Sequence, residues 1–168
     1  VYKRQILAYA NKERPGTSVS DVLQAHYHKY GRNFFSRYDY EEVDSAGANA
    51  MMNDLRSKFT DPNFIGTSLG AFKAAQAGDF SYTDPIDHSV SKNQGLYVRM
   101  EDGSRIVFRL SGTGSAGATI RLYVEKYTSV EREYAADVQQ ALKPIIQVAL
   151  DLSALQRHTG REQPTVIT

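Results

Sequence analysis

The stretch Arg109 to Arg121, which reads Arg-Leu-Ser-Gly-Thr-Gly-Ser-Ala-Gly-Ala-Thr-Ile-Arg, predicts two strands joined by a glycine-rich loop. Before the loop, Ile106, Phe108 and Leu110 occupy every second position, which is the period of a strand with one buried face. After the loop the same spacing recurs in a second apolar set: Ala118, Ile120, Leu122 and Val124. The stretch therefore predicts a β-hairpin whose opposite face is mainly polar.

The two arginines at the ends of this stretch are expected to face each other. If Leu110 pairs near Ile120, Arg109 and Arg121 lie opposite on the polar face, with β-carbons about 5 Å apart. Two like charges at that separation are unfavourable unless an anion lies between them. The loop adds glycines that permit close backbone approach and hydroxyl donors: Gly112, Gly114, Gly117, Ser111, Thr113 and Ser115. This combination predicts a phosphate-binding loop.

Three other interpretations compete for the same residues. The glycines also fit G-x-G-x-x-G, but a dinucleotide-binding turn must lead into a helix, and the alternation after Gly117 predicts a strand. A Walker loop is excluded because no Gly-Lys-Ser or Gly-Lys-Thr closes the run. An ordinary glycine-rich hairpin with solvated arginines stays open, because glycine marks turns more often than ligand sites.

Longer runs on both sides of the hairpin extend the pattern over most of the chain. In chain order they are Tyr30 to Glu42, Gly47 to Asn49 with Met51 and Met52, Asp84 to Asp87, Asn93 to Leu96, Asp102 to Arg105, Arg109 to Tyr123 and Pro164 to Thr168. Together they resemble the C-terminal domain of the phosphoglucomutase family, in the alpha-D-phosphohexomutase superfamily. The resemblance runs from about Ile6 to the last residue.

The resemblance implies an enzyme that interconverts glucose 1-phosphate and glucose 6-phosphate through glucose 1,6-bisphosphate. In that family a phosphoserine in the first domain transfers the phosphoryl group, Mg²⁺ in the second domain assists, and a loop of the fourth domain binds the phosphate that is not being transferred. The residues that match this loop are Arg109, Ser111, Gly112, Thr113, Gly114 and Arg121. No catalytic or metal-binding residue is expected in this chain, so the chain alone is predicted to be inactive. Its expected partners are the phosphosugar and the N-terminal domains of the same polypeptide.

Arg37 lies in the aromatic and basic run that the resemblance identifies as the hinge into the last domain. It matches an arginine that approaches the active-site cleft and is therefore a candidate cleft residue. Packing between domains is an equally good interpretation, because aromatic side chains such as Phe34 and Tyr38 surround it in sequence. Asp39, Glu41 and Glu42 are interpreted as negative charges that favour the start of a helix.

Composition restricts the kinds of partner. The chain has 168 residues, 20 Lys and Arg, and 19 Asp and Glu, so its net charge of +1 gives no broad attraction for nucleic acid or anionic membranes. It has no cysteine, which excludes disulfides and thiolate metal sites. No apolar run reaches the length of about 18 residues that a membrane helix needs, and no signal peptide is recognised. A cytoplasmic location is expected.

The predicted organisation is one modest domain preceded by the end of another. Residues 1–30 are expected to close the preceding third domain, with Val1 to Gln5 as candidates for residues foreign to the family, and residues 31–168 to form the C-terminal phosphate-binding domain. Ser18 and Asp21 predict a capping box for a helix that ends at Gly31. The fold class expected is α+β: a mainly antiparallel sheet of about four strands with flanking helices.

Two helices are expected against that sheet. One runs from about Glu41 to Phe59, where Asp61-Pro62 ends it. The other follows an apolar stripe from Tyr134 to Leu155 and stops at Gly160, and Pro144 is expected to bend it or to begin a second helix.

Two other functions stay open. The superfamily includes structural members that resemble this domain, lack mutase activity and work through protein partners, so a non-catalytic structural or adhesion protein is one alternative. A free-standing phosphosugar or phosphopeptide binder is another. The sequence upstream of Val1 discriminates them, because an active-site serine and an Asp-rich metal loop there favour the enzyme.

Overall fold

The computed structural model describes residues 1–114 and 117–168 and divides the chain into two compact units. The first unit comprises Val1–Asn33 and Tyr127–Ala136. It contains two helices and a 3-10 turn: α1 (Tyr2–Glu13), α2 (Val19–Tyr30) and η2 (Glu131–Glu133). The predicted capping box of α2 is confirmed, since Ser18 and Asp21 each accept a hydrogen bond from the other's backbone N–H. Gly31, with φ of 81°, ends this helix as predicted.

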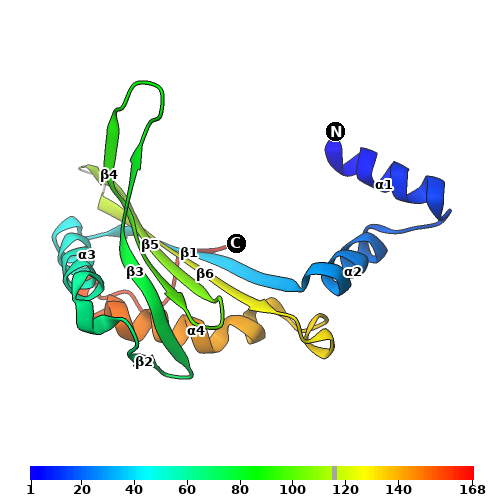
Figure 1. Ribbon diagram of the computed structural model, residues 1–168. Helices are drawn as coiled ribbons and strands as arrows, with labels where there is room; N and C mark the ends of the chain where they lie inside the picture. The colour runs from blue at the N-terminus through cyan, green and yellow to red at the C-terminus, as the bar shows by residue number, and fades with distance from the viewer. Residues whose placement is uncertain (115–116) are drawn as a thin grey trace. The chain divides into compact units, whose positions relative to one another are not determined.

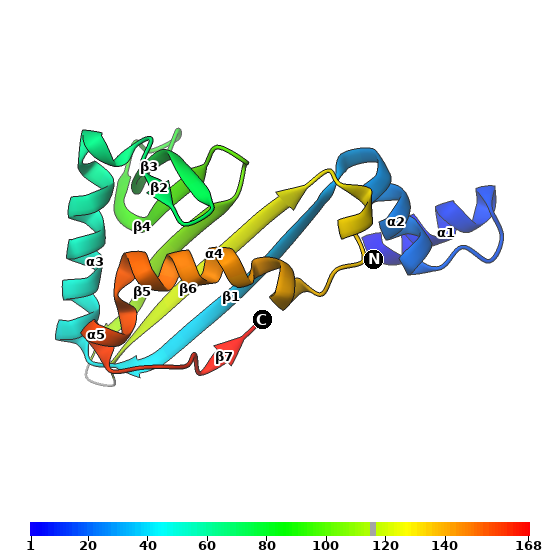
Figure 2. The ribbon, with the colours of Figure 1, turned by 90° about the horizontal axis from the view of Figure 1, so that it is seen from below.

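The second unit comprises Phe34–Lys126 and Asp137–Thr168 and is built on a seven-stranded sheet. The strands lie in the order β2-β3-β4-β5-β6-β1-β7 (Figures 1 and 2). Their bounds are β1 (Arg32–Val43), β2 (Ser68–Leu69), β3 (Phe72–Thr83), β4 (Val90–Met100), β5 (Arg105–Gly114), β6 (Gly117–Thr128) and β7 (Val166–Ile167). The pairs β1/β7, β2/β3, β3/β4, β4/β5 and β5/β6 are antiparallel. The predicted α+β class is confirmed, but the estimate of about four strands is wrong.

The prediction lacks β1, β2 and β7, and the reasons can be identified. In β1 buried and exposed residues do not alternate, since Tyr38, Asp39 and Tyr40 are all buried. β2 and β7 have two residues each, which is too short for a periodic pattern. β3 begins at Phe72, well before the short strand expected around Phe80.

The helices pack on one face of the sheet. They are α3 (Ser45–Thr60), α4 (Val138–Ser153) and α5 (Leu155–Thr159), with a 3-10 turn, η1 (Pro62–Phe64), after α3. α3 was predicted to begin near Glu41; it begins at Ser45, where the Asp44 side chain accepts a hydrogen bond from the Gly47 N–H. Pro144 lies inside α4, so no second helix begins there. Gly160 is the stop as predicted, but the single helix expected from Tyr134 to Leu155 is wrong, because α4 begins at Val138 and Ala154, with a left-handed φ of 45°, separates α4 from α5.

The sheet has one covered face and one open face. Ile106, Phe108, Ile120 and Leu122 are fully buried, and they form one core with residues of α3 and α4 such as Leu142. Figure 2 shows α3 and α4 on the same side of the strands. The other residues of β5 and β6 therefore point away from the helices. Within the described residues, no helix combines the length and the apolar character needed to cross a membrane.

Candidate functional site

Arg109 of β5 and Arg121 of β6 are direct cross-strand partners, as predicted. The neighbouring pair, Leu110 with Ile120, confirms the register. Both arginines lie on the open face, because the residues beside them in each strand are buried beneath the helices. Arg109 is exposed, and within residues 1–114 and 117–168 no hydrogen bond or ion pair holds its guanidinium. This leaves its five N–H donors available to a ligand.

The hairpin beyond this pair is irregular on the β5 side. Ser111 pairs with Thr119 and Gly114 with Gly117, so β5 carries one more residue than β6 between these pairs, which makes a bulge. Gly112 supplies the positive φ of 65° that the bulge contains. Ser115 lies outside the described residues, and the donor roles of the Thr113 and Ser115 hydroxyls stay predictions. The structure therefore shows a bulge next to the arginine pair, with Gly112 at its positive φ.

Gly117 fixes the base of the hairpin against β1. Its φ is 89°, and a β-carbon at this position would lie 3.2 Å from both the Glu42 Cα and the Val43 carbonyl oxygen. Any other residue would combine the strain of a positive φ with a tight contact to backbone atoms, so glycine is favoured here. Glu42 itself has a positive φ of 53°. The loop is therefore seated on a turn of the neighbouring strand.

Asp39 on β1 is a member of the site that the sequence interpretation missed. It is 4% exposed. Its Oδ1 lies 2.9 Å from the Arg37 Nε and its Oδ2 lies 3.8 Å from the Arg121 Nε. The interpretation of Asp39, Glu41 and Glu42 as charges at a helix start is wrong, because all three lie in β1 and Asp44 caps α3. Residues two apart, such as Arg37 and Asp39, share one face in a strand. Because this segment was not predicted to be a strand, the sequence did not bring the two side chains together.

Arg37 is thus joined to the arginine pair through Asp39. Its side chain is 37% exposed, so part of the guanidinium reaches solvent. It also lines a hollow of about 540 Å³ on the open face, together with Phe35, Arg105 and Tyr123. The structure therefore places Arg37 at the edge of the candidate site, and its contact with ligand stays a prediction.

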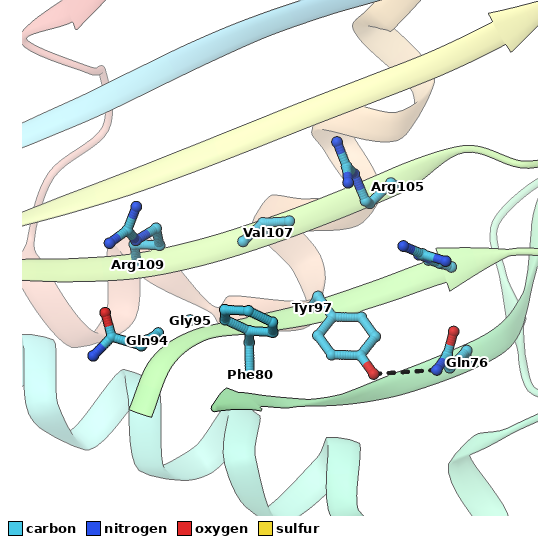
Figure 3. A pocket seen from close by; sticks show the side chains of 9 residues that line it. Gln76, Phe80, Gln94, Gly95, Tyr97, Arg105, Val107 and Arg109 are labelled. Atoms are coloured by element: carbon cyan, nitrogen blue, oxygen red, sulfur yellow. Dashed lines mark hydrogen bonds between the residues drawn. The ribbon is translucent and has the colours of Figure 1, made fainter. Parts of the chain in front are cut away.

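A second hollow, of about 500 Å³, lies on the β4 side of Arg109 (Figure 3). It is lined by Gln76, Phe80, Gln94, Gly95, Tyr97, Arg99, Arg105, Val107 and Arg109. The Tyr97 hydroxyl accepts a hydrogen bond of 3.2 Å from the Gln76 amide, which fixes one wall. Arg121 does not line this hollow. Arg109 is therefore the residue that connects the hollow with the loop.

Gly95 determines where the Arg109 side chain can lie. A β-carbon at position 95 would come within 3.1 Å of the Arg109 Cγ and 3.3 Å of the Phe108 carbonyl oxygen. The absence of a side chain at Gly95 thus lets the Arg109 stem lie across β4. The predicted site omitted Gly95, although Asn93 to Leu96 contributed to the resemblance.

The charges of this cluster sum to a positive value. Three guanidiniums, those of Arg37, Arg109 and Arg121, accompany one carboxylate, that of Asp39, which gives a net charge of +2. Phosphate monoesters carry about −1.5 to −2 at neutral pH. In the described part of the chain, no group of three or more His, Asp and Glu residues could hold a metal ion. The net charge of the arginine cluster is complementary to that of a phosphate monoester.

Comparison with known proteins identifies the family of this chain. The family described as "Phosphoglucomutase-1, C-terminal domain" matches residues 32–165. "Phosphoglucomutase 1, chloroplastic" from Marchantia polymorpha is 53% identical over 97% of this chain, and "Phosphoglucomutase-1" from Homo sapiens is 54% identical over 90% of it. The chain spans 26% and 28%, respectively, of the length of these relatives.

A solved structure agrees with the fold as well. The open form of the exocytosis-sensitive phosphoprotein pp63/parafusin, a phosphoglucomutase from Paramecium, superposes with a TM-score of 0.81 and 46% sequence identity. The superposition covers 97% of this chain and 27% of the Paramecium chain. With an opposed arginine pair under a glycine-bearing hairpin and a family match over residues 32–165, the chain belongs to the phosphoglucomutase family and corresponds to its C-terminal domain.

Proposed function

We propose that this chain is the phosphate-binding domain of a longer phosphoglucomutase. In that role it binds the non-transferring phosphate of glucose 1-phosphate, glucose 6-phosphate and glucose 1,6-bisphosphate. The observation that carries the proposal is the direct opposition of Arg109 and Arg121 beneath the bulge at Gly112. Like charges at that position are unfavourable in the free domain, and a bound dianion would remove the repulsion.

The proposed contribution to catalysis is positional. Binding energy from a phosphate that does not react can orient the sugar and favour closure of a mobile domain, so its loss lowers turnover as well as affinity. The proposed loop residues are Arg109, Ser111, Gly112, Thr113, Gly114 and Arg121, with Arg37 at the edge of the cleft. The phosphoryl-carrying serine and the Mg²⁺ site are proposed to lie in other domains, so no step of the transfer is assigned to this chain.

We also propose a domain boundary between residues 30 and 31, and that Val1 to Gln5 are foreign to the family. The whole enzyme is proposed to use Mg²⁺ and glucose 1,6-bisphosphate. A cytoplasmic location is also a prediction, and the Marchantia relative is named as chloroplastic.

The test is a matched pair of substitutions in the full-length polypeptide. Arg109→Ala is expected to weaken glucose 6-phosphate binding by about 1.5 to 3 kcal/mol, which is about 10- to 150-fold in the dissociation constant. Arg99→Ala is the control. Arg99 of β4 is exposed and lines the same hollow as Arg109, but it lies away from the loop. Equal effects of the two substitutions would show general electrostatic attraction in place of a specific phosphate site.

A second candidate is a non-catalytic role through protein partners. It is favoured by the name of the Paramecium relative, which joins phosphoglucomutase with an exocytosis-sensitive phosphoprotein. A coupled mutase assay on the full-length polypeptide distinguishes the two functions. Sugar-phosphate binding without turnover favours the second candidate, and turnover that Arg109→Ala reduces favours the enzyme.

A further inference from the structure

Asp39 occupies a position that a simple anion-binding surface would not contain. It is a buried carboxylate in the middle of a site proposed to bind a dianion. Each of its oxygens faces a different guanidinium, with the Arg37 Nε 2.9 Å from Oδ1 and the Arg121 Nε 3.8 Å from Oδ2. A carboxylate beside a phosphate site is electrostatically unfavourable, so its presence needs a reason.

The main chain holds Asp39 firmly in this place. β7 pairs with β1 at Asp39 and Val166, and the Thr165 N–H donates a 2.7 Å hydrogen bond to the Asp39 carbonyl oxygen. Two residues earlier, Arg37 and Thr168 exchange backbone hydrogen bonds of 2.8 and 3.0 Å. The carboxylate is therefore attached to a strand that is secured at its edge, whereas Arg121 has a long and flexible side chain.

The contacts of Asp39 are close but incomplete. The Arg37 Nε, the Asp39 Oδ1 and the Arg121 Nε are buried, and none of them has an aligned hydrogen-bond partner among the described residues. Arginine has five N–H donors. Asp39 lies nearest to the Nε of Arg121, so the two terminal amino groups of Arg121 are left to a ligand. Polar contacts of binding sites are often long in the free protein and tighten when ligand binds.

On the basis of the proposed function, we infer that Asp39 is a positioning residue for phosphate binding through Arg121. Its carboxylate orients the Nε edge of the Arg121 guanidinium toward β1, so that the terminal amino groups face the space between Arg121 and Arg109. Orientation and net charge make opposite predictions for neutralising this carboxylate. If net charge alone mattered, its removal would raise the charge of the cluster and tighten phosphate binding. If orientation matters, the same removal weakens binding.

The experiment compares two isosteric neutralisations in the full-length polypeptide. Asp39→Asn is expected to weaken glucose 6-phosphate binding about tenfold, the loss of one well-oriented contact. Glu125→Gln is the control, because Glu125 also pairs with an arginine on this face, its Oε2 lying 2.6 Å from the Arg105 Nη2. The control removes the same charge without touching Arg121, and its affinity is expected to stay within about twofold of the parent. Equal or tighter binding by Asp39→Asn overturns the inference.

A double-mutant cycle separates positioning from general structural damage. If Asp39 acts through Arg121, adding Asp39→Asn to Arg121→Ala causes no further loss of affinity. A further tenfold loss in that background overturns the inference. Asp39→Glu keeps the charge and supplies a second cycle if Asp39→Asn does not fold, and its loss of affinity must likewise vanish in the Arg121→Ala background. Failure of the proposed function gives a different result, because then Arg121→Ala alone leaves binding unchanged.

Discussion

Gly95 of β4 lies directly beneath the side chain of Arg109 of β5, so that a β-carbon at position 95 would approach the Arg109 Cγ to 3.1 Å. Gly95→Ala is therefore expected to displace the guanidinium and to raise the KM for glucose 1-phosphate several-fold in the full-length polypeptide. Gly78→Ala is the control, because its β-carbon would meet mainly the ring and hydroxyl of Tyr97, at 3.3 Å or more. A Gly95→Ala protein with native thermal stability and unchanged KM would contradict this role.

Gly117 allows a test of how the loop is seated. Gly117→Ala is expected to lower the free energy of unfolding by about 1 to 3 kcal/mol, since it combines positive φ with a backbone clash. Gly103→Ala has nearly the same φ, 85° against 89°, but its β-carbon meets nothing within 4 Å. It therefore carries the conformational strain alone. In urea denaturation, Gly117→Ala should lose more of the free energy of unfolding than Gly103→Ala. Equal losses would contradict a destabilising contact of the new β-carbon with Glu42.

Tyr40 gives a prediction for alkaline pH. Burial raises the pKa of the Tyr40 phenol above its ordinary value of 10.0, and neighbouring Tyr38 adds to this. A raised pKa in the folded state means that the stability this group contributes is complete below pH 10.0 and is lost as pH rises through the folded pKa. Over that window stability should fall by up to about 1.4 kcal/mol per pH unit.

Tyr40→Phe should remove this part of the alkaline loss. Urea denaturation at pH 9 and at a pH above 10 measures this slope for the parent and for Tyr40→Phe. Identical slopes for the parent and Tyr40→Phe would show that the phenol ionises as easily folded as unfolded.

The proposed division of labour also predicts the behaviour of the chain by itself. The 168-residue chain should show no mutase turnover in a coupled assay. The reason is that the phosphoryl-carrying serine and the Mg²⁺ site are proposed to lie in other domains of the longer polypeptide. Measurable turnover that survives removal of contaminating enzyme would contradict the assignment of the chemistry to other domains.

The sequence predicted the parts of the fold whose patterns are local. Alternation on both sides of the glycine-rich loop was sufficient to pair Leu110 with Ile120, and hence Arg109 with Arg121. The Ser18 and Asp21 capping box and the stop at Gly160 are likewise short-range signals with one physical cause each.

β1 escaped prediction because its burial is set by distant partners. Tyr38, Asp39 and Tyr40 are buried in succession, as β6 and β7 flank this strand. Aspartate is usually exposed, so a sequence alone predicts a surface position for it unless its charged partners are known. The role proposed for Asp39 was hidden for the same reason, since Arg121 is far away in sequence. The role of Gly95 could not be predicted, because it depends on the Arg109 side chain lying across it in the folded structure.

The opposed arginines also give ionic strength two contrary effects on this protein. Dissolved salt screens the repulsion between Arg109 and Arg121, so the melting temperature of the ligand-free domain should rise when salt is added. The same screening weakens attraction for a sugar phosphate, so occupancy should fall. The melting temperatures with and without the sugar phosphate should therefore converge as the salt concentration rises. The ligand is expected to stabilise the domain most in dilute buffer.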